Sequence, residues 1–98
     1  MNKTEAAYAV LLEQHRQAGK IKDWMFEAIT LRLARRTSYT PDFYVVLPDG
    51  SREFHETKGF MRDDANVKLK VAANKFPSFT FRLVRRKAGF WDIVEVQR

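Results

Sequence analysis

Three charged side chains in the middle of the sequence have the types and spacing that could do chemistry. Asp42 comes just before one alternating apolar stretch, and Glu56 and Lys58 lie at the end of the next. Two carboxylates can hold a hard cation such as Mg²⁺, and an ammonium beside them can orient a water or offset charge that builds on a phosphorus atom. If the three side chains meet, they support metal-assisted hydrolysis of a phosphodiester.

A hairpin between the two stretches would bring these side chains together. Residues 43–47 and 52–58 alternate as short strands do, on either side of Pro48-Asp49-Gly50. Pro suits the first central position of a type I turn and Gly suits the left-handed position that follows. The segment therefore predicts a three-residue loop in which Leu47 faces Ser51. A two-residue loop would shift the pairing by one position, so the site depends on the turn type.

The register set by this turn places the two acids together. The numbers of opposed residues sum to 98, so Asp42 lies opposite Glu56 with Cβ atoms about 4.5 to 5.5 Å apart. Lys58 projects to the same face as Glu56, because strand side chains alternate. Like charges opposed on a sheet destabilise it, so either Lys58 or a metal ion must neutralise the pair. The carbonyl of Thr57 and waters would complete the coordination of such a metal.

The helix expected at residues 4–18 could add a third carboxylate. Thr4 is its expected N-cap, and Tyr8 and Leu12 mark its inward stripe. Glu5 falls on that stripe one turn before Tyr8, where it would serve as a metal ligand or as a base for the water. The alternative, which stays open, is a Glu stabilised by the helix dipole and left in solvent.

The remaining segments predict a mixed central sheet flanked by helices. Residues 21–34 alternate as one long strand, or as a strand with a bend. In it Glu27 is a second inward carboxylate, an edge charge or a partner for a nearby Arg. The other expected elements are a polar connection at 35–40, a helix at 62–76 and strands at 79–86 and 90–96. The order is then α-β-β-β-α-β-β, an α/β fold in one domain that covers residues 1–98.

The amino-acid composition limits the classes of protein to which the chain can belong. Hydrophobic residues are 45% and charged residues 31% of the chain, which is typical of a globular domain, and no stretch approaches the roughly 18 apolar residues that span a bilayer. With no cysteine, disulfides and thiolate metal sites are excluded. Lys and Arg number 18 against 12 Asp and Glu, a net charge of +6. This excess favours nucleic acid as a partner, although a basic protein without such a partner fits the charge equally well.

The residues around the acids resemble a known family. The segments Tyr39-Thr40-Pro41-Asp42-Phe43 and Glu56-Thr57-Lys58-Gly59, with the Pro48-Asp49-Gly50 turn between them, are similar to the PD...ExK signature of restriction-endonuclease-like nucleases. The likeness is closest to Holliday-junction resolvases of the phage endonuclease I type and to small phage nuclease-like domains. It extends to a Glu near the start of the preceding helix, the strand before the signature, and the Asp63-Asp64 and Lys-rich helix after it, which is most of the chain.

The resemblance implies a role for each matching residue. The implied catalytic set is Glu5, Asp42, Glu56 and Lys58, and the implied metal ligands are Asp42, Glu56, Thr57 and Glu5. Glu13 is an alternative to Glu5, because the connection from helix to strand is longer here. The implied activity is Mg²⁺-dependent hydrolysis of DNA, with Mn²⁺ as a substitute, by a homodimer that acts on branched or junction DNA in phage recombination. The implied location is the cytoplasm, that of the host if the chain is phage-encoded, with no membrane and no nucleotide cofactor.

Basic residues elsewhere fit contacts with the DNA backbone, although each one alone could equally be part of a solvated rim. They are Arg35, Arg36, Arg62, Lys68, Lys70, Arg85, Arg86 and Lys87. His55 is expected to be structural, because it points to the opposite face from Glu56. Two further functions stay open: a non-catalytic DNA-binding or assembly module on the same fold, and a nuclease that nicks or cuts duplex, flap or single-stranded DNA.

Overall fold

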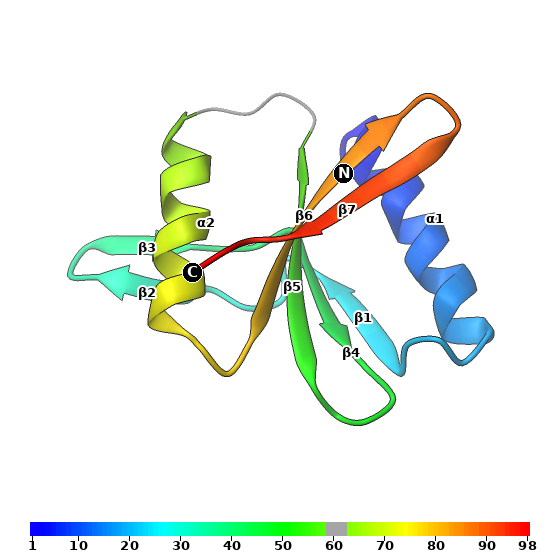
Figure 1. Ribbon diagram of the computed structural model, residues 1–98, viewed down its shortest axis with the longest axis horizontal. Helices are drawn as coiled ribbons and strands as arrows, with labels where there is room; N and C mark the ends of the chain where they lie inside the picture. Colours follow the sequence, from blue (N-terminus) through cyan, green and yellow to red (C-terminus); the bar gives the residue numbers. More distant parts are fainter. Residues whose placement is uncertain (59–62) are drawn as a thin grey trace.

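The computed structural model describes residues 1–58 and 63–98, with the backbone alone at 63–65. The elements follow in chain order as labelled in Figure 1: α1 (Lys3–Gln17), β1 (Asp23–Phe26), β2 (Leu31–Ala34), β3 (Thr37–Tyr39), β4 (Phe43–Val46), β5 (Arg52–Lys58), α2 (Asp63–Lys75), β6 (Thr80–Lys87) and β7 (Phe90–Glu95). A Cα radius of gyration of 13.1 Å is that of a compact chain of this length.

A mixed five-stranded sheet lies at the centre, in the order β1-β4-β5-β6-β7. Strands β5 and β6 are parallel, because α2 carries the chain from the end of one to the start of the other, and the other neighbours are antiparallel. The helices lie on opposite sides of this sheet (Figure 1). The expected α/β class, with a mixed sheet flanked by helices, is confirmed at this level.

Helix α1 packs on one face of the sheet through the stripe expected from the sequence. Tyr8 and Leu12 are buried against Phe43 and Val45 of β4 and Val84 of β6. The helix begins one residue earlier than expected, and its N-cap is Asn2 rather than Thr4. The reason is a capping box: the Asn2 side chain accepts from the Glu5 amide at 2.8 Å, and the Glu5 carboxylate accepts from the Asn2 amide at 2.7 Å.

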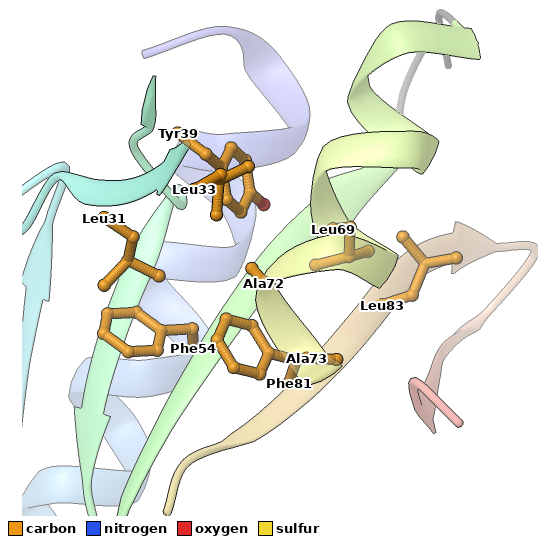
Figure 2. Close-up of a cluster of buried hydrophobic side chains, with 9 residues drawn as sticks. All are labelled: Leu31, Leu33, Tyr39, Phe54, Leu69, Ala72, Ala73, Phe81 and Leu83. Carbon is orange, nitrogen blue, oxygen red and sulfur yellow. The ribbon is translucent and has the colours of Figure 1, made fainter. Parts of the chain in front are cut away.

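Helix α2 covers the opposite face together with the small sheet formed by β2 and β3. Figure 2 shows the side chains that meet there, from the small sheet, the central sheet and the helix: Leu31, Leu33, Tyr39, Phe54, Phe81, Leu83, Leu69, Ala72 and Ala73. These residues are less than 9% exposed. The small sheet is therefore part of the core, which fixes where its residues lie relative to β5.

The expectation of one long strand at residues 21–34 was wrong. Strand β1 pairs with β4, the chain turns at Glu27 with φ 47°, and β2 then pairs with β3 in a separate sheet. The two strands pack in different hydrophobic cores, because Trp24 packs towards α1 whereas Leu31 packs towards α2. The segment expected as a polar connection contains β3, so the structure has one more strand before the hairpin and a break in the long one.

Candidate active site

The β4–β5 hairpin brings Asp42 and Glu56 together as the turn predicted. Phe43 pairs with His55 and Val46 with Arg52, so the numbers of opposed residues sum to 98. At the turn, Gly50 has φ 87° and donates to the Leu47 carbonyl at 2.9 Å.

The strand pairing ends at Phe43 and His55, and the two acids come next to one another just beyond it. The Asp42 amide donates to Glu56 Oε1 at 3.1 Å, so the main chain of one acid contacts the side chain of the other.

Each carboxylate is oriented by neighbours that bind one of its two oxygens. Asp42 Oδ2 accepts from the amide and the hydroxyl of Thr57, at 2.9 and 2.8 Å. Glu56 Oε1 accepts from the hydroxyl of Tyr39 at 2.7 Å as well as from the Asp42 amide. None of the hydrogen bonds described for residues 1–58 and 63–98 uses Asp42 Oδ1 or Glu56 Oε2. The Glu5 carboxylate, however, also lies within hydrogen-bond distance of the Asp42 side chain.

The electrostatics of the pair are those of crowded, partly desolvated carboxylates. Burial raises the pKa of Glu56 to about 7, and the charges of Asp42 and then Glu5 add to this, against the hydrogen bond from Tyr39. Burial also raises the pKa of Asp42, and the hydrogen bonds from Thr57 offset this only in part. Without a cation, Glu56 is therefore partly protonated at near-neutral pH.

Glu5 stands beside the pair and serves the helix cap at the same time. Its side chain lies within hydrogen-bond distance of the Asp42 carboxylate, and its charge raises the pKa of both Asp42 and Glu56. Its Oε1 is nevertheless committed to the Asn2 amide. The side chain is half-buried near the acids and also caps its own helix, and its role as a metal ligand or base stays a prediction.

Two other carboxylates considered from the sequence are not part of the site. Glu13 is bound by Arg16, Gln17 and the Trp24 indole, and hydrogen bonds from Arg16 and Trp24 hold its pKa at about 2. It cannot replace Glu5. The Glu27 side chain is exposed, and only its amide approaches the site, donating to the Asp42 carbonyl at 2.8 Å.

The oxygen donors fit a hard cation, with fewer carboxylates than expected. Among the residues that the structure describes, no three His, Cys, Asp or Glu side chains are arranged to hold a metal. Asp42 and Glu56 are the two acids at the end of the hairpin, and Glu5 lies beside them with its Oε1 in the helix cap. Mg²⁺ is commonly held by one or two carboxylates plus water and substrate phosphates, so the pair is chemically sufficient.

Lys58 ends β5, two residues after Glu56. Strand alternation puts its ammonium on the face of Glu56, as expected. Its neighbour across the parallel pairing with β6 is Arg85. Within the described part of the chain, Lys58 forms no ion pair with Asp42 or Glu56. Two cations therefore lie beside two acids at the same end of the sheet.

The remaining basic residues gather at three places in the fold. The exposed turn between β2 and β3 holds Arg35 and Arg36, α2 holds Lys68 and Lys70, and the end of β6 holds Arg85, Arg86 and Lys87. Arg36 has φ 63°, a left-handed conformation that closes the turn. Arg62 lies outside the described residues, as do the side chains of Asp63 and Asp64. The turn between β2 and β3 is joined to the site through Tyr39, the last residue of β3.

A buried polar network on the other face of β5 was missed from the sequence. His55, expected to be structural, accepts or donates at Nδ1 with the Tyr8 hydroxyl at 2.6 Å and at Nε2 with Glu53 at 2.8 Å. Arg82 binds both oxygens of Glu53 at 2.9 and 3.0 Å. Burial raises the pKa of Glu53, but the hydrogen bonds from His55 and Arg82 outweigh it and hold the pKa at about 2. The available signal was strand alternation, which puts Glu53 on the inward side with His55.

Tyr39 was also missed as a member of the site. It belongs to the segment that resembles the nuclease signature, but no role was inferred for its hydroxyl. Burial is the main cause that raises its pKa, followed by the charge of Glu56, so the phenol stays protonated and acts as a donor. Strand β3, which carries it, was expected as a connection, and its pairing with β2 puts the phenol on the core side.

Comparison with protein-family models, with curated proteins and with solved structures finds no match to this chain. Neither of the helices described in residues 1–58 and 63–98 has the length and apolar composition needed to cross a membrane.

Proposed function

We propose that this chain is a Mg²⁺-dependent endonuclease that hydrolyses phosphodiester bonds of DNA on a restriction-endonuclease-like core. The observation that carries the proposal is the contact of Asp42 with Glu56, two part-buried acids at the end of the β4–β5 hairpin. Burying two like charges together is unfavourable unless a cation joins them. The hairpin, the helix after it and the parallel strand that follows support the proposed core.

Each residue of the site has a distinct role in the proposed hydrolysis. Asp42 and Glu56 would hold the metal through the oxygens that face no described donor, with the Thr57 carbonyl as a further ligand. When bound, Mg²⁺ supplies Lewis acidity at the scissile phosphate. Lys58 offers its ammonium to the attacking water or to the phosphate oxygen on which charge builds. The water oxygen bonds to phosphorus, one ester P–O bond breaks, and the products are a phosphate monoester and an alcohol.

The second role of the neighbours is to fix the two acids. Thr57 holds Asp42 and Tyr39 holds Glu56, each through hydrogen bonds shorter than 3 Å. Carboxylates that are already oriented lose little freedom when a metal and a phosphate arrive. Glu5, capped but nearby, adds negative charge that favours a divalent cation in the same place.

Branched DNA is the proposed substrate, and a homodimer is the proposed active form. The net charge of +6 and the arginines at the β2–β3 turn support backbone contacts that do not read bases. A four-way junction needs two symmetric cuts, and one chain presents one site, so two copies are needed. The likeness to resolvases supports the same choice.

The test is cleavage of end-labelled four-way junction, flap, linear duplex and single-stranded DNA of matched sequence. Each is incubated with Mg²⁺, with Mn²⁺ or with EDTA. We expect symmetric nicks in the junction that need the metal and are lost in Glu56→Gln, which keeps the shape of the side chain and one acceptor oxygen. Glu95→Gln, an exposed acid on β7, is the matched control and should cut as the wild type does.

Two outcomes would overturn the proposal. Cleavage that persists in EDTA would remove the metal from the mechanism. Cleavage by Glu56→Gln at the wild-type rate would remove the carboxylate pair from it. Preference for duplex, flap or single-stranded DNA over the junction would keep the nuclease and change the substrate.

A second function, a non-catalytic DNA-binding module, is favoured by one observation. Three acidic or histidine ligands are not arranged together in the described residues, and Glu5 is committed to its cap. This function predicts binding of DNA with no cleavage of any substrate in Mg²⁺ or Mn²⁺. The same set of reactions, read beside a binding titration, separates it from the nuclease.

A further inference from the structure

Arg85 lies directly beside Lys58 at the ends of two parallel strands. The register of β5 with β6 pairs Glu56 with Leu83 and Lys58 with Arg85. Side chains opposed in a sheet point to the same face, so Arg85 shares the face of Lys58 and Glu56. Arg86, the next residue, points to the other face, where its guanidinium lies 4.7 Å from the centre of the Trp91 ring.

The guanidinium of Arg85 has an unmet hydrogen-bond donor. Its Nε is buried, yet no acceptor lies within hydrogen-bond distance of it in the described part of the chain. Asp92, opposed to it on β7, pairs instead with Lys87 at 3.8 Å. Arg82, three residues earlier on the same strand, shows the usual arrangement of a part-buried arginine. Its Nε and one terminal nitrogen donate to the two oxygens of Glu53. Buried polar groups are nearly always paired, so the Arg85 donor is suited to an acceptor that is not among the described residues, such as an oxyanion ligand.

None of the ion pairs described for residues 1–58 and 63–98 joins Lys58 or Arg85 to an acid. Two neighbouring cations repel each other, and an oxyanion between them would relieve this repulsion. Arginine presents a planar fork of donors that matches phosphate, whereas lysine acts as a point charge. The site proposed above brings a phosphodiester to Lys58. The same phosphate would then meet the Arg85 fork from the neighbouring strand.

Building on the proposed nuclease function, we propose that Arg85 is a further catalytic residue, which binds a non-bridging oxygen of the scissile phosphate beside Lys58. It supplies the donor that stabilises charge building on that phosphate as water attacks. Arg85 is thereby separated from Arg86 and Lys87, whose side chains already have partners within the chain. Arg85 thus contacts the reacting phosphate, whereas the exposed basic residues contact only the DNA backbone around it.

The test compares single-turnover cleavage with DNA affinity in three variants. Removing one preorganised donor from a developing oxyanion typically slows a reaction about 100- to 1,000-fold. We expect that loss in Arg85→Gln, with DNA affinity changed less than about threefold, and partial recovery in Arg85→Lys because it keeps the charge. Arg52→Gln, an exposed arginine at the other end of β5, loses the same charge and should cleave as the wild type does.

A structural role for Arg85 predicts a different pattern. Arg85→Met keeps the length of the side chain and removes the unmet donor, so its melting temperature should equal or exceed that of the wild type, while cleavage is lost. A variant that melts lower than the wild type and regains activity on cooling would assign Arg85 to folding. Cleavage within threefold of wild type in Arg85→Met and Arg85→Gln, with Glu56→Gln inactive, would overturn the inference and leave the nuclease intact.

A readout independent of catalysis separates the two proposals. The Arg85 Nε–H resonance, assigned by its loss in Arg85→Lys, should shift when a short DNA duplex is added, because it gains an acceptor. If the wild type cleaves no DNA but this resonance shifts, the nuclease proposal fails and the phosphate contact stands. No shift at saturating DNA would overturn the contact.

Discussion

The amide of Asp42 donates to Oε1 of Glu56 across the β4–β5 hairpin, at 3.1 Å. The chain thus holds two acids together through the main chain of one and the side chain of the other. Three residues earlier on β5, Glu53 points to the opposite face and is neutralised by Arg82. One strand therefore carries a buried and a half-buried glutamate whose pKa values move in opposite directions. The same substitution should thus have opposite effects at the two positions.

Glu56→Gln should stabilise the metal-free protein while abolishing cleavage. The amide keeps an oxygen for Tyr39 and for the Asp42 amide, and it removes one of two crowded charges. We expect the free energy of unfolding at pH 8 in EDTA to rise by about 1 to 2 kcal/mol. Urea denaturation measures it, and a variant less stable than the wild type would contradict the repulsion between the two acids.

Glu53→Gln should have the opposite effect. Arg82 and His55 would lose a charged acceptor on a face that is packed under α1. We expect a loss of about 2 to 3 kcal/mol at pH 7. The pKa of Glu53 is lowered to about 2 in the fold, so its stabilisation is present above about 4.5 and is lost as the pH falls towards 2. The difference in free energy of unfolding between Glu53→Gln and the wild type should disappear over that range. A difference that is constant with pH would show that the charge of Glu53 is not what stabilises the fold.

The stability of the metal-free protein should depend on pH through the ionisation of Glu56. Its pKa is raised from 4.5 to about 7, so its contribution is fully present below pH 4.5 and is lost as the pH rises to 7. The stability of the wild type relative to Glu56→Gln should therefore fall between these values and level off above them. Added Mg²⁺ should restore stability most at pH 8, where both acids are ionised. Stabilisation by Mg²⁺ that is equal in the wild type and in Glu56→Gln would exclude binding at this pair.

Tyr39→Phe should shift the pH profile of cleavage to higher pH. The hydrogen bond from Tyr39 lowers the pKa of Glu56, so its loss lets that pKa rise and leaves less carboxylate at pH 7. We expect about a tenfold slower reaction at pH 7 that is partly recovered at pH 9. Tyr44→Phe, a half-buried tyrosine on β4 that packs on Phe54, is the control and should leave the profile unchanged. Equal profiles for both variants would show that Tyr39 does not position the acid.

Gly50→Ala should weaken the hairpin that sets the register. Gly50 has φ 87°, and nothing lies within 4 Å of an added Cβ, so the cost is one of backbone conformation alone. We expect a loss of about 1 kcal/mol, and less for Gly50→Asn, which tolerates the left-handed region better. Thermal unfolding of the three proteins gives this order, and equal stability of all three would mean that the turn tolerates other conformations.

Local chemistry explains which features could be predicted from the sequence. The Pro48-Asp49-Gly50 turn admits few conformations, so it predicts both the register of the hairpin and the meeting of Asp42 with Glu56. The stripe of Tyr8 and Leu12 likewise predicts which side of α1 is buried. These inferences rest on residues close in sequence, where sterics and periodicity leave few alternatives.

Long-range packing explains the features that could not be predicted. The break at Glu27 arises because the residues before it pack in the core under α1 and those after it in the core under α2. The alternating pattern is the same on both sides, so it does not show where one core ends. The hydrogen bond from Tyr39 to Glu56 and the neighbouring places of Lys58 and Arg85 join segments that are 17 and 27 positions apart. Strand pairing at such separations depends on the burial of whole faces, which no local pattern specifies. The order of residues is thus enough to specify the acid pair and its register, whereas the residues that orient the pair and the cation beside it follow from how distant segments pack.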